Sequence, residues 1–214
     1  MVAWKKPLKK GKSPRRGRDF FAVHPRFGRI ATMSEIILYP TETIYALGVN
    51  AFDSEAWKAL CALKNRNVTQ SSSWLVRSIS DIEEWAVVTK EAQALIEEHL
   101  PGPLTLVLKA KNTVPTHAQA ADGTVSFRIS SDPVAVLLIR DYMSKHEVPL
   151  TCTSANVHGL ETGATVREIL TQFSESANKI TKIVDDGVRR SEASTIVRCL
   201  GTTVEILRHG AVHL

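Results

Sequence analysis

Cysteine is scarce in this sequence, and long apolar runs are missing. The 214 residues include three widely separated cysteines, Cys61, Cys152 and Cys199. This odd, scattered set argues against a disulfide framework or a closed zinc site. It predicts a reducing, cytoplasmic setting in which each thiol is a small buried hydrophobe. No apolar stretch is long enough to span a bilayer, so we expect no membrane segment.

Several catalytic signatures are also missing. The sequence contains no GxxxxGK[ST] phosphate loop, no GxGxxG after an expected strand, no HExxH and no GxSxG. Its seven histidines are scattered without metal-ligand spacing, so no protein metal site is predicted. A nucleotide site would have to be assembled from dispersed Lys, Arg, Ser and Asn side chains.

Acidic residues are almost absent from the first 30 positions. Residues 1–30 hold ten Lys/Arg and one acid, Asp19, whereas the rest of the chain is mildly acidic. We expect a flexible basic tail (1–30) and one domain (31–214) long enough to bury a core. The tail would raise affinity for RNA or DNA through counterion release, and a cleaved targeting segment is the alternative.

Short strands and helices intermix from residue 35 onward. We expect strands at 35–40, 73–79, 104–110, 124–130, 148–152, 182–186, 194–199 and 203–208. Expected helices are 53–64, 81–88, 89–100, 132–146 and 165–173, the first capped by Asp53 or Ser54 and the fourth started by Asp132 and Pro133. Because strict βαβ alternation is missing, the pattern predicts an α/β or α+β fold, an open twisted mixed sheet with flanking helices.

Three polar segments stand where predicted elements end, and each also has a purely structural explanation. Thr41, after Pro40, is either a hydrogen-bonding group or part of a polar turn. In KNR, Lys64 and Arg66 would converge on one anion if the backbone were extended, or would merely favour a helix C-terminus. In TSAN, Ser154 and Asn156 alternate, so in an extended loop they would face one phosphate or ribose; a plain turn is the alternative.

Two arginines lie in strands that are otherwise apolar, Arg128 in TVSFRIS and Arg208 in EILRHG. A cation in such a strand is costly unless it is exposed or paired, and these are the more frequent outcomes. Together with Lys64 and Arg66, however, the two arginines would form a cradle for an anion.

Seven segments together resemble the YrdC-like threonylcarbamoyl-AMP synthases. YPTETIYALG, KNR, PGPLT (101–105), TVSFR, TSANVHG, STIV and LRHG stand in the order of that family's motifs, over roughly residues 35–210. The resemblance implies a sheet with a concave face that binds ligand or RNA. It also implies synthesis of L-threonylcarbamoyladenylate from L-threonine, bicarbonate and ATP with release of pyrophosphate, for N6-threonylcarbamoylation of adenosine 37 in tRNA.

The resemblance assigns roles to individual residues. Lys64 and Arg66 would be catalytic and meet the ATP phosphates. Thr41, Arg128 and Ser194 would bind L-threonine, Arg128 through its carboxylate. The remaining ATP ligands would be Thr124, Ser154, Asn156, Thr162 and Arg208. Mg²⁺ would accompany ATP, and a downstream threonylcarbamoyl transferase complex would use the product.

The sequence also departs from the family pattern. After KNR the family has a proline and then a Pro-Leu pair, whereas NVTQSSSW (67–74) stands here, and Ala46 replaces a glycine. The chain stops soon after LRHG, so the single-domain form is expected. These changes keep a second hypothesis open: a double-stranded RNA- or tRNA-binding module of the same fold without synthase activity.

Overall fold

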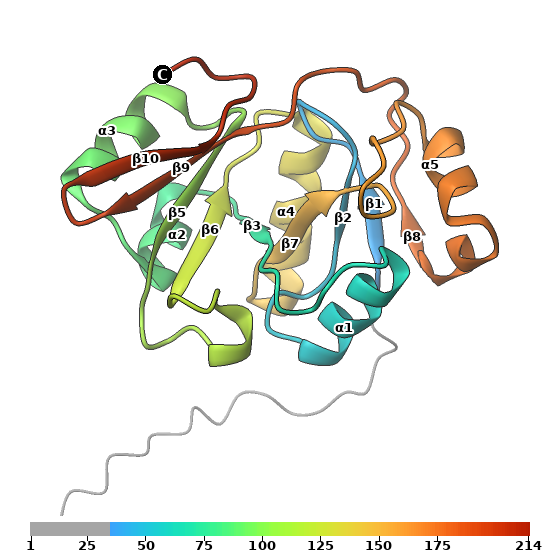
Figure 1. The fold of residues 1–214 in the computed structure, drawn as a ribbon, viewed down its shortest axis with the longest axis horizontal. Helices are drawn as coiled ribbons and strands as arrows, with labels where there is room; N and C mark the ends of the chain where they lie inside the picture. Colours follow the sequence, from blue (N-terminus) through green and yellow to red (C-terminus); the bar gives the residue numbers. More distant parts are fainter. Residues whose placement is uncertain (1–34) are drawn as a thin grey trace, which may run out of the picture. The chain divides into compact units, whose positions relative to one another are not determined.

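A 10-stranded mixed sheet organises the computed structural model, which describes residues 35–214 (Figure 1). The predicted basic tail, 1–30, lies outside the described residues. The strands are β1 (Ile37–Tyr39), β2 (Ala46–Gly48), β3 (Ser73–Leu75), β4 (Ala86–Val87), β5 (Leu104–Ala110), β6 (Thr124–Arg128), β7 (Leu150–Ser154), β8 (Lys182–Ile183), β9 (Thr195–Leu200) and β10 (Thr203–Arg208).

The sheet order is β10-β9-β5-β6-β3-β7-β2-β1-β8, with β4 paired to β5. The pairs β3–β6, β5–β9 and β1–β8 are parallel, and the other pairs are antiparallel. This arrangement confirms the predicted mixed sheet. Along residues 35–214, no helix combines the length and the apolar character needed to cross a membrane.

Helices flank the sheet, as predicted (Figure 1). They are α1 (Ser54–Leu63), α2 (Ile79–Trp85), α3 (Lys90–His99), α4 (Pro133–His146) and α5 (Val166–Phe173), with short 3-10 turns at Thr116–Ala118 and Ser174–Lys179. The caps explain two of the starts. Asp53 accepts hydrogen bonds from the first-turn amides of α1, and Asp132 does the same for α4, where Pro133 takes the first position.

Two short strands were predicted incorrectly. The expected helix 81–88 ends at Trp85, and Ala86–Val87 turn into extended backbone that pairs with the end of β5. Residues 46–48 were read only as part of a polar motif, yet they form β2, which pairs with β1 and β7. Both strands have three residues or fewer, so tertiary pairing rather than local pattern defines them.

Alternation along the strands separates an apolar face from a polar face. In β6, Val125 and Phe127 join the main core cluster together with buried residues of α2, α3 and α4. Successive side chains point to opposite faces, so Ser126 and Arg128 face the other way. Side chains of β5 and β9 alternate similarly, with Leu106 and Val197 in the same core cluster. The second core cluster joins β1 and β2 to α1 and α5. The polar face of β5, β6 and β9 is where a cavity opens.

Candidate functional site

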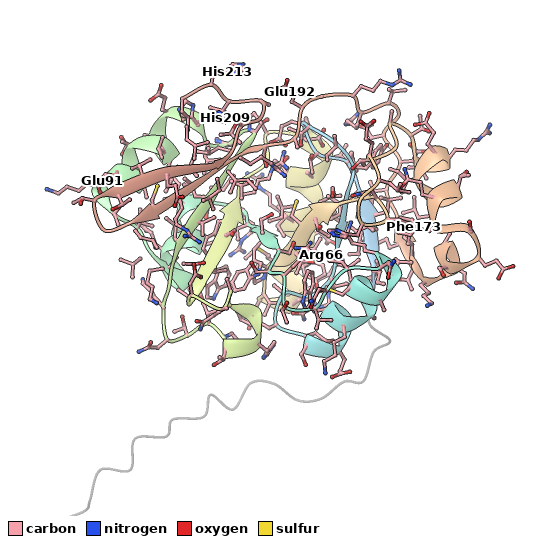
Figure 2. All side chains as sticks on the ribbon, viewed as in Figure 1. Arg66, Glu91, Phe173, Glu192, His209 and His213 are labelled. Carbon is pink, nitrogen blue, oxygen red and sulfur yellow. The ribbon has the colours of Figure 1, made fainter. Side chains whose placement is uncertain are left out.

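A cavity of about 790 Å³ opens on the polar face of the sheet. Its wall is built mainly from hydroxyl groups and arginines. The polar lining residues include Thr41, Thr43, Arg66, Ser71, Ser72, Ser73, Thr105, Ser126, Arg128, Thr153, Ser154, Asn156, Thr162, Ser191, Ser194 and Arg208. Figure 2 labels Arg66 near α1. Such a wall suits a highly charged anionic ligand.

KNR closes helix α1 and is not extended. Asn65 adopts a left-handed backbone conformation with φ 53°. Its N–H donates to the oxygen of Ala62 (3.2 Å), and the N–H of Arg66 donates to that of Cys61 (2.9 Å). These two bonds form a Schellman motif, so KNR has the helix C-terminal geometry that was the alternative to an extended backbone. Lys64 and Arg66 nevertheless both reach the end of β7, by different contacts.

Lys64 is 2% exposed and does not line the cavity. Its ammonium donates to the backbone oxygens of Ser154 and Asn156 (2.8 Å for the latter) and to Asn156 Oδ1 (3.4 Å). An ammonium has three donors, and three protein acceptors surround this one. Burial, followed by the charge of Arg66, lowers the pKa of Lys64 to about 7.

The predicted contact of Lys64 with the ATP phosphates stays a prediction. In the described structure, the ammonium of Lys64 clamps the turn after β7. The reason is that the end of α1 abuts residues 154–158, where the N–H of His158 also donates to the oxygen of Lys64 (2.8 Å). Lys64 thus contacts two residues of the cavity wall, Ser154 and Asn156.

Arg66 lies on the cavity wall and is held from four directions. Its Nη1 donates to Thr153 Oγ1 (3.0 Å), its Nη2 to the oxygen of Ser71 (2.5 Å) and its Nε to Gln70 Oε1 (3.1 Å). The guanidinium carbon lies 5.5 Å from the ring centroid of Trp57. Burial lowers the pKa of Arg66. The atypical segment after KNR therefore wraps the arginine and fixes its direction.

The TSAN turn places the predicted nucleotide ligands beside Arg66. Ser154 Oγ donates to Asn156 Oδ1 (2.5 Å), and Asn156 Nδ2 donates to the oxygen of Leu160 (2.6 Å). Thr162 follows on the same wall. Ser154, Asn156 and Thr162 are thus brought together, as predicted from the sequence.

Arg128 ends β6 at the floor of the cavity and is 5% exposed. Its Nη2 donates to Thr43 Oγ1 (2.6 Å) and Glu42 Oε1 (2.9 Å), and lies 3.5 Å from Thr41 Oγ1. Burial lowers the pKa of Arg128, but Cys152 and Glu42 outweigh it, and the net shift is upward. The predicted pair Thr41 and Arg128 is therefore brought together, and Glu42 joins it.

Ser194 and Arg208 form the opposite wall. Ser194 Oγ lies 2.8 Å from Thr105 Oγ1, and Arg208 Nη2 donates to the backbone oxygen (2.6 Å) and Oγ (3.1 Å) of Ser194. Arg208 is exposed as a residue, but partial desolvation of its guanidinium and the charge of Arg128 lower its pKa. Gly210 permits this contact, because a Cβ there would lie 2.1 Å from the backbone oxygen of Ala193.

Thr124, like Lys64, is a predicted site residue that does not line the cavity. It begins β6, and its Oγ1 donates to Asp122 Oδ1 (2.6 Å). Four residue steps separate its Cα from that of Arg128, or about 13 Å along the strand. Ser126, which the sequence reasoning missed, lines the cavity instead. The alternation in TVSFR would have indicated it.

Acidic groups are sparse at the site. Glu161 is the one carboxylate residue among those that line the cavity within the described chain. Among residues 35–214, no three His, Cys, Asp or Glu side chains gather closely enough to hold a metal ion. A metal that entered this cavity would depend mainly on ligands brought by a substrate.

Comparison with known proteins adds independent findings. Residues 30–210 match the Sua5_yciO_yrdC family, described as "Telomere recombination". A relative from Methanocaldococcus jannaschii is 32% identical over 179 residues, covering 83% of this chain and 81% of the relative. A Pyrococcus abyssi relative, named threonylcarbamoyl-AMP synthase, is 31% identical over 84% of this chain and 52% of its own length.

A solved structure extends the similarity to three dimensions. The crystal structure of P. abyssi Sua5 complexed with L-threonine superimposes with a TM-score of 0.73 at 30% identity, covering 82% of this chain and 50% of that one. This chain therefore spans about half the length of the P. abyssi proteins that it matches.

Proposed function

The chain belongs to the Sua5_yciO_yrdC family, and on this premise we propose that it makes L-threonylcarbamoyladenylate from L-threonine, bicarbonate and ATP, releasing pyrophosphate. One observation carries the proposal. Arg66, Arg128 and Arg208 meet in a single 790 Å³ cavity, and only Arg128 has a carboxylate partner among the described residues. Such an excess of positive charge fits a triphosphate together with an amino-acid carboxylate.

We assign the polar residues of the cavity to two substrates, the nucleotide and the amino acid. Arg66 and Arg208 neutralise the ATP phosphates, while Ser154, Asn156 and Thr162 hydrogen-bond the nucleotide. Lys64 contributes by holding the turn that carries Ser154 and Asn156. Mg²⁺ bound to the ATP phosphates would add to this neutralisation of charge.

At the amino-acid end, Arg128 binds the carboxylate of L-threonine, and Thr41 and Ser194 offer hydroxyl groups. The threonine amine takes up the carbon of bicarbonate to give a carbamate and water. A carbamate oxygen then attacks the α-phosphorus, and the bond to pyrophosphate breaks. Positioning and charge neutralisation supply the rate enhancement, so the scarcity of acids and bases on the wall is no obstacle.

The product is a mixed anhydride, which must be passed to an acceptor. We place that acceptor as adenosine 37 of tRNA, modified at N6 by a threonylcarbamoyl transferase complex. Residues 1–30 would add electrostatic affinity for tRNA. Cys61, Cys152 and Cys199 are buried free thiols, which suits a reducing compartment such as the cytoplasm.

The test is pyrophosphate release by the full chain, with each substrate omitted in turn. Release should require L-threonine, bicarbonate and ATP together, and the adenylate should appear by mass spectrometry. ATP hydrolysis without threonine, or no turnover, would reject the synthase. Tight binding of double-stranded RNA in fluorescence anisotropy would then favour the binding module.

A further inference from the structure

The guanidinium of Arg128 is held by the protein at one end only. Its Nη2 donates to Thr43 Oγ1 (2.6 Å) and Glu42 Oε1 (2.9 Å). Its Nε is buried and has no acceptor in the structure, and no hydrogen bond from Nη1 is made to any residue in 35–214. A buried arginine with an unused donor beside a cavity is suited to a carboxylate, because a hydrogen bond between two charged groups is a strong one.

Glu42 differs from its two neighbours. Thr41 and Thr43 line the cavity, whereas Glu42 does not. Both of its carboxylate oxygens are in use, because Oε1 accepts from Arg128 and Oε2 accepts from Ser130 Oγ. The side chain of Glu42 is 14% exposed, so the pair is largely withdrawn from solvent. Glu42 therefore contacts the guanidinium of Arg128 directly and is not placed to contact a ligand in the cavity.

The carboxylate of Glu42 is itself fixed by the start of helix α4. Ser130 is buried, and its Oγ accepts a hydrogen bond from the N–H of Asp132 (3.2 Å). Asp132 in turn caps α4 through the amides of Val134 and Ala135 (2.9 Å each). Hydrogen bonds through Asp132, Ser130 and Glu42 thus connect the start of α4 to Nη2 of Arg128. They do not involve Nε or Nη1 of Arg128.

We propose that Glu42 is a positioning residue for the amino-acid substrate, holding Arg128 by Nη2 so that Nη1 donates to the substrate carboxylate. Its negative charge also lets Arg128 and Arg208 face one cavity before any ligand is bound. The identity of the carboxylate as that of L-threonine rests on the proposed function. The orientation of Arg128 by Glu42 is independent of the proposed function.

The kinetic test compares Glu42→Gln with the wild type. Gln keeps the size of Glu but presents an amide to Arg128 and Ser130. We expect KM for L-threonine to rise about 10- to 100-fold, since one partner of a buried pair is lost, while KM for ATP changes less than twofold. Glu42→Asp, which keeps the charge, should recover part of the loss. Equal rises in both KM values, or none, would overturn the proposal.

Asp81→Asn is the matched control. Asp81 is a buried carboxylate paired with Arg77 (2.6 Å) at the start of α2 and does not line the cavity. This variant should lower Tm at least as much as Glu42→Gln and leave KM for L-threonine unchanged. If Glu42→Gln behaved in the same way, its role would be structural only.

A spectroscopic readout separates this inference from the proposed function. The ¹H–¹⁵N signal of Arg128 Nε, assigned with Arg128→Lys, should be sharp in the wild type and shifted or broadened in Glu42→Gln. An unchanged signal would overturn the positioning role. If the wild type released no threonine-dependent pyrophosphate, the proposed function would fail, and the signal would still decide whether Glu42 orients Arg128.

Discussion

The ammonium of Lys64 lies 2.8 Å from the backbone oxygen of Asn156 and so fastens the end of α1 to the turn that follows β7. This contact joins two of the polar segments noted in the sequence, KNR and TSAN. It also makes one lysine responsible for the geometry of two other site residues, Ser154 and Asn156.

Replacing Lys64 with Met should lower stability and weaken ATP use together. The variant leaves buried carbonyl oxygens without a donor, which costs about 1–3 kcal/mol in the free energy of unfolding. KM for ATP should rise because the turn after β7 is loosened, although Arg66 remains. Urea denaturation and pyrophosphate kinetics measure the two effects. Lys58→Met, on the exposed side of the same helix, is the control and should change stability by less than about 0.5 kcal/mol.

Stability should also depend on pH through Lys64. Its pKa is about 7 in the folded protein, against about 10.4 for an unfolded lysine. Between these values the unfolded chain binds a proton that the folded protein has released. The free energy of unfolding of the wild type, relative to Lys64→Met, should therefore rise with pH by up to about 1.4 kcal/mol per unit. Urea denaturation from pH 6.5 to 9.5 tests this. A constant difference would mean that the three carbonyl contacts keep the lysine protonated.

Gln70 should matter to ATP use although it does not line the cavity. Its Oε1 accepts from Arg66 Nε, so Gln70→Leu frees one edge of the guanidinium. We expect KM for ATP to rise by a factor of about 3 to 10, equivalent to about 1 kcal/mol, and KM for L-threonine to stay constant. Arg66→Ala should cost more, about 1–3 kcal/mol. If Gln70→Leu matched the wild type, the segment after KNR would have no part in orienting Arg66.

Gly210→Ala should disturb the wall formed by Ser194 and Arg208. A Cβ at this position would meet the backbone of residues 193–195, whose atoms cannot move aside cheaply. We expect a loss of about 1–3 kcal/mol in stability and a reduced kcat/KM. Gly201→Ala, in the open turn between β9 and β10, should cost only its backbone strain, about 1 kcal/mol. Thermal melts and steady-state kinetics compare them. A Gly210→Ala variant with an unchanged kcat/KM would show that the wall tolerates the added Cβ.

Local patterns were sufficient for the long elements. Asp53 and Asp132 cap the helices that they were expected to start, because capping depends on residues within one turn. They were insufficient where pairing partners are distant, as in β2 and β4. At the site, motif order located Thr41, Arg128 and Ser194 near one cavity.

Other features of the site depend on three-dimensional placement. The sequence could not reveal that Lys64 faces carbonyl oxygens, since those oxygens come from residues about 90 positions later. Thr124 does not line the cavity for a simpler reason, because it begins β6 and lies about 13 Å along the strand from Arg128. Glu42 is part of the first motif, YPTETIYALG. The sequence does not show that its carboxylate pairs with Arg128, because the two residues are 86 positions apart.

The order of strands in the sheet also bears on how firmly each end of the cavity is built. Arg128 stands on β6, a central strand with hydrogen-bonded neighbours on both sides, whereas Arg208 ends β10, the last strand of the order, all of whose residues are exposed. An edge strand with a bulge just before its arginine opens at a lower free energy than an interior one. Amide hydrogen exchange should therefore be fast along β10 and slow along β6. The part of the cavity around Arg128, proposed to bind the amino acid, would therefore be preformed. The part around Arg208, proposed to bind the larger nucleotide, would adapt its conformation to the ligand.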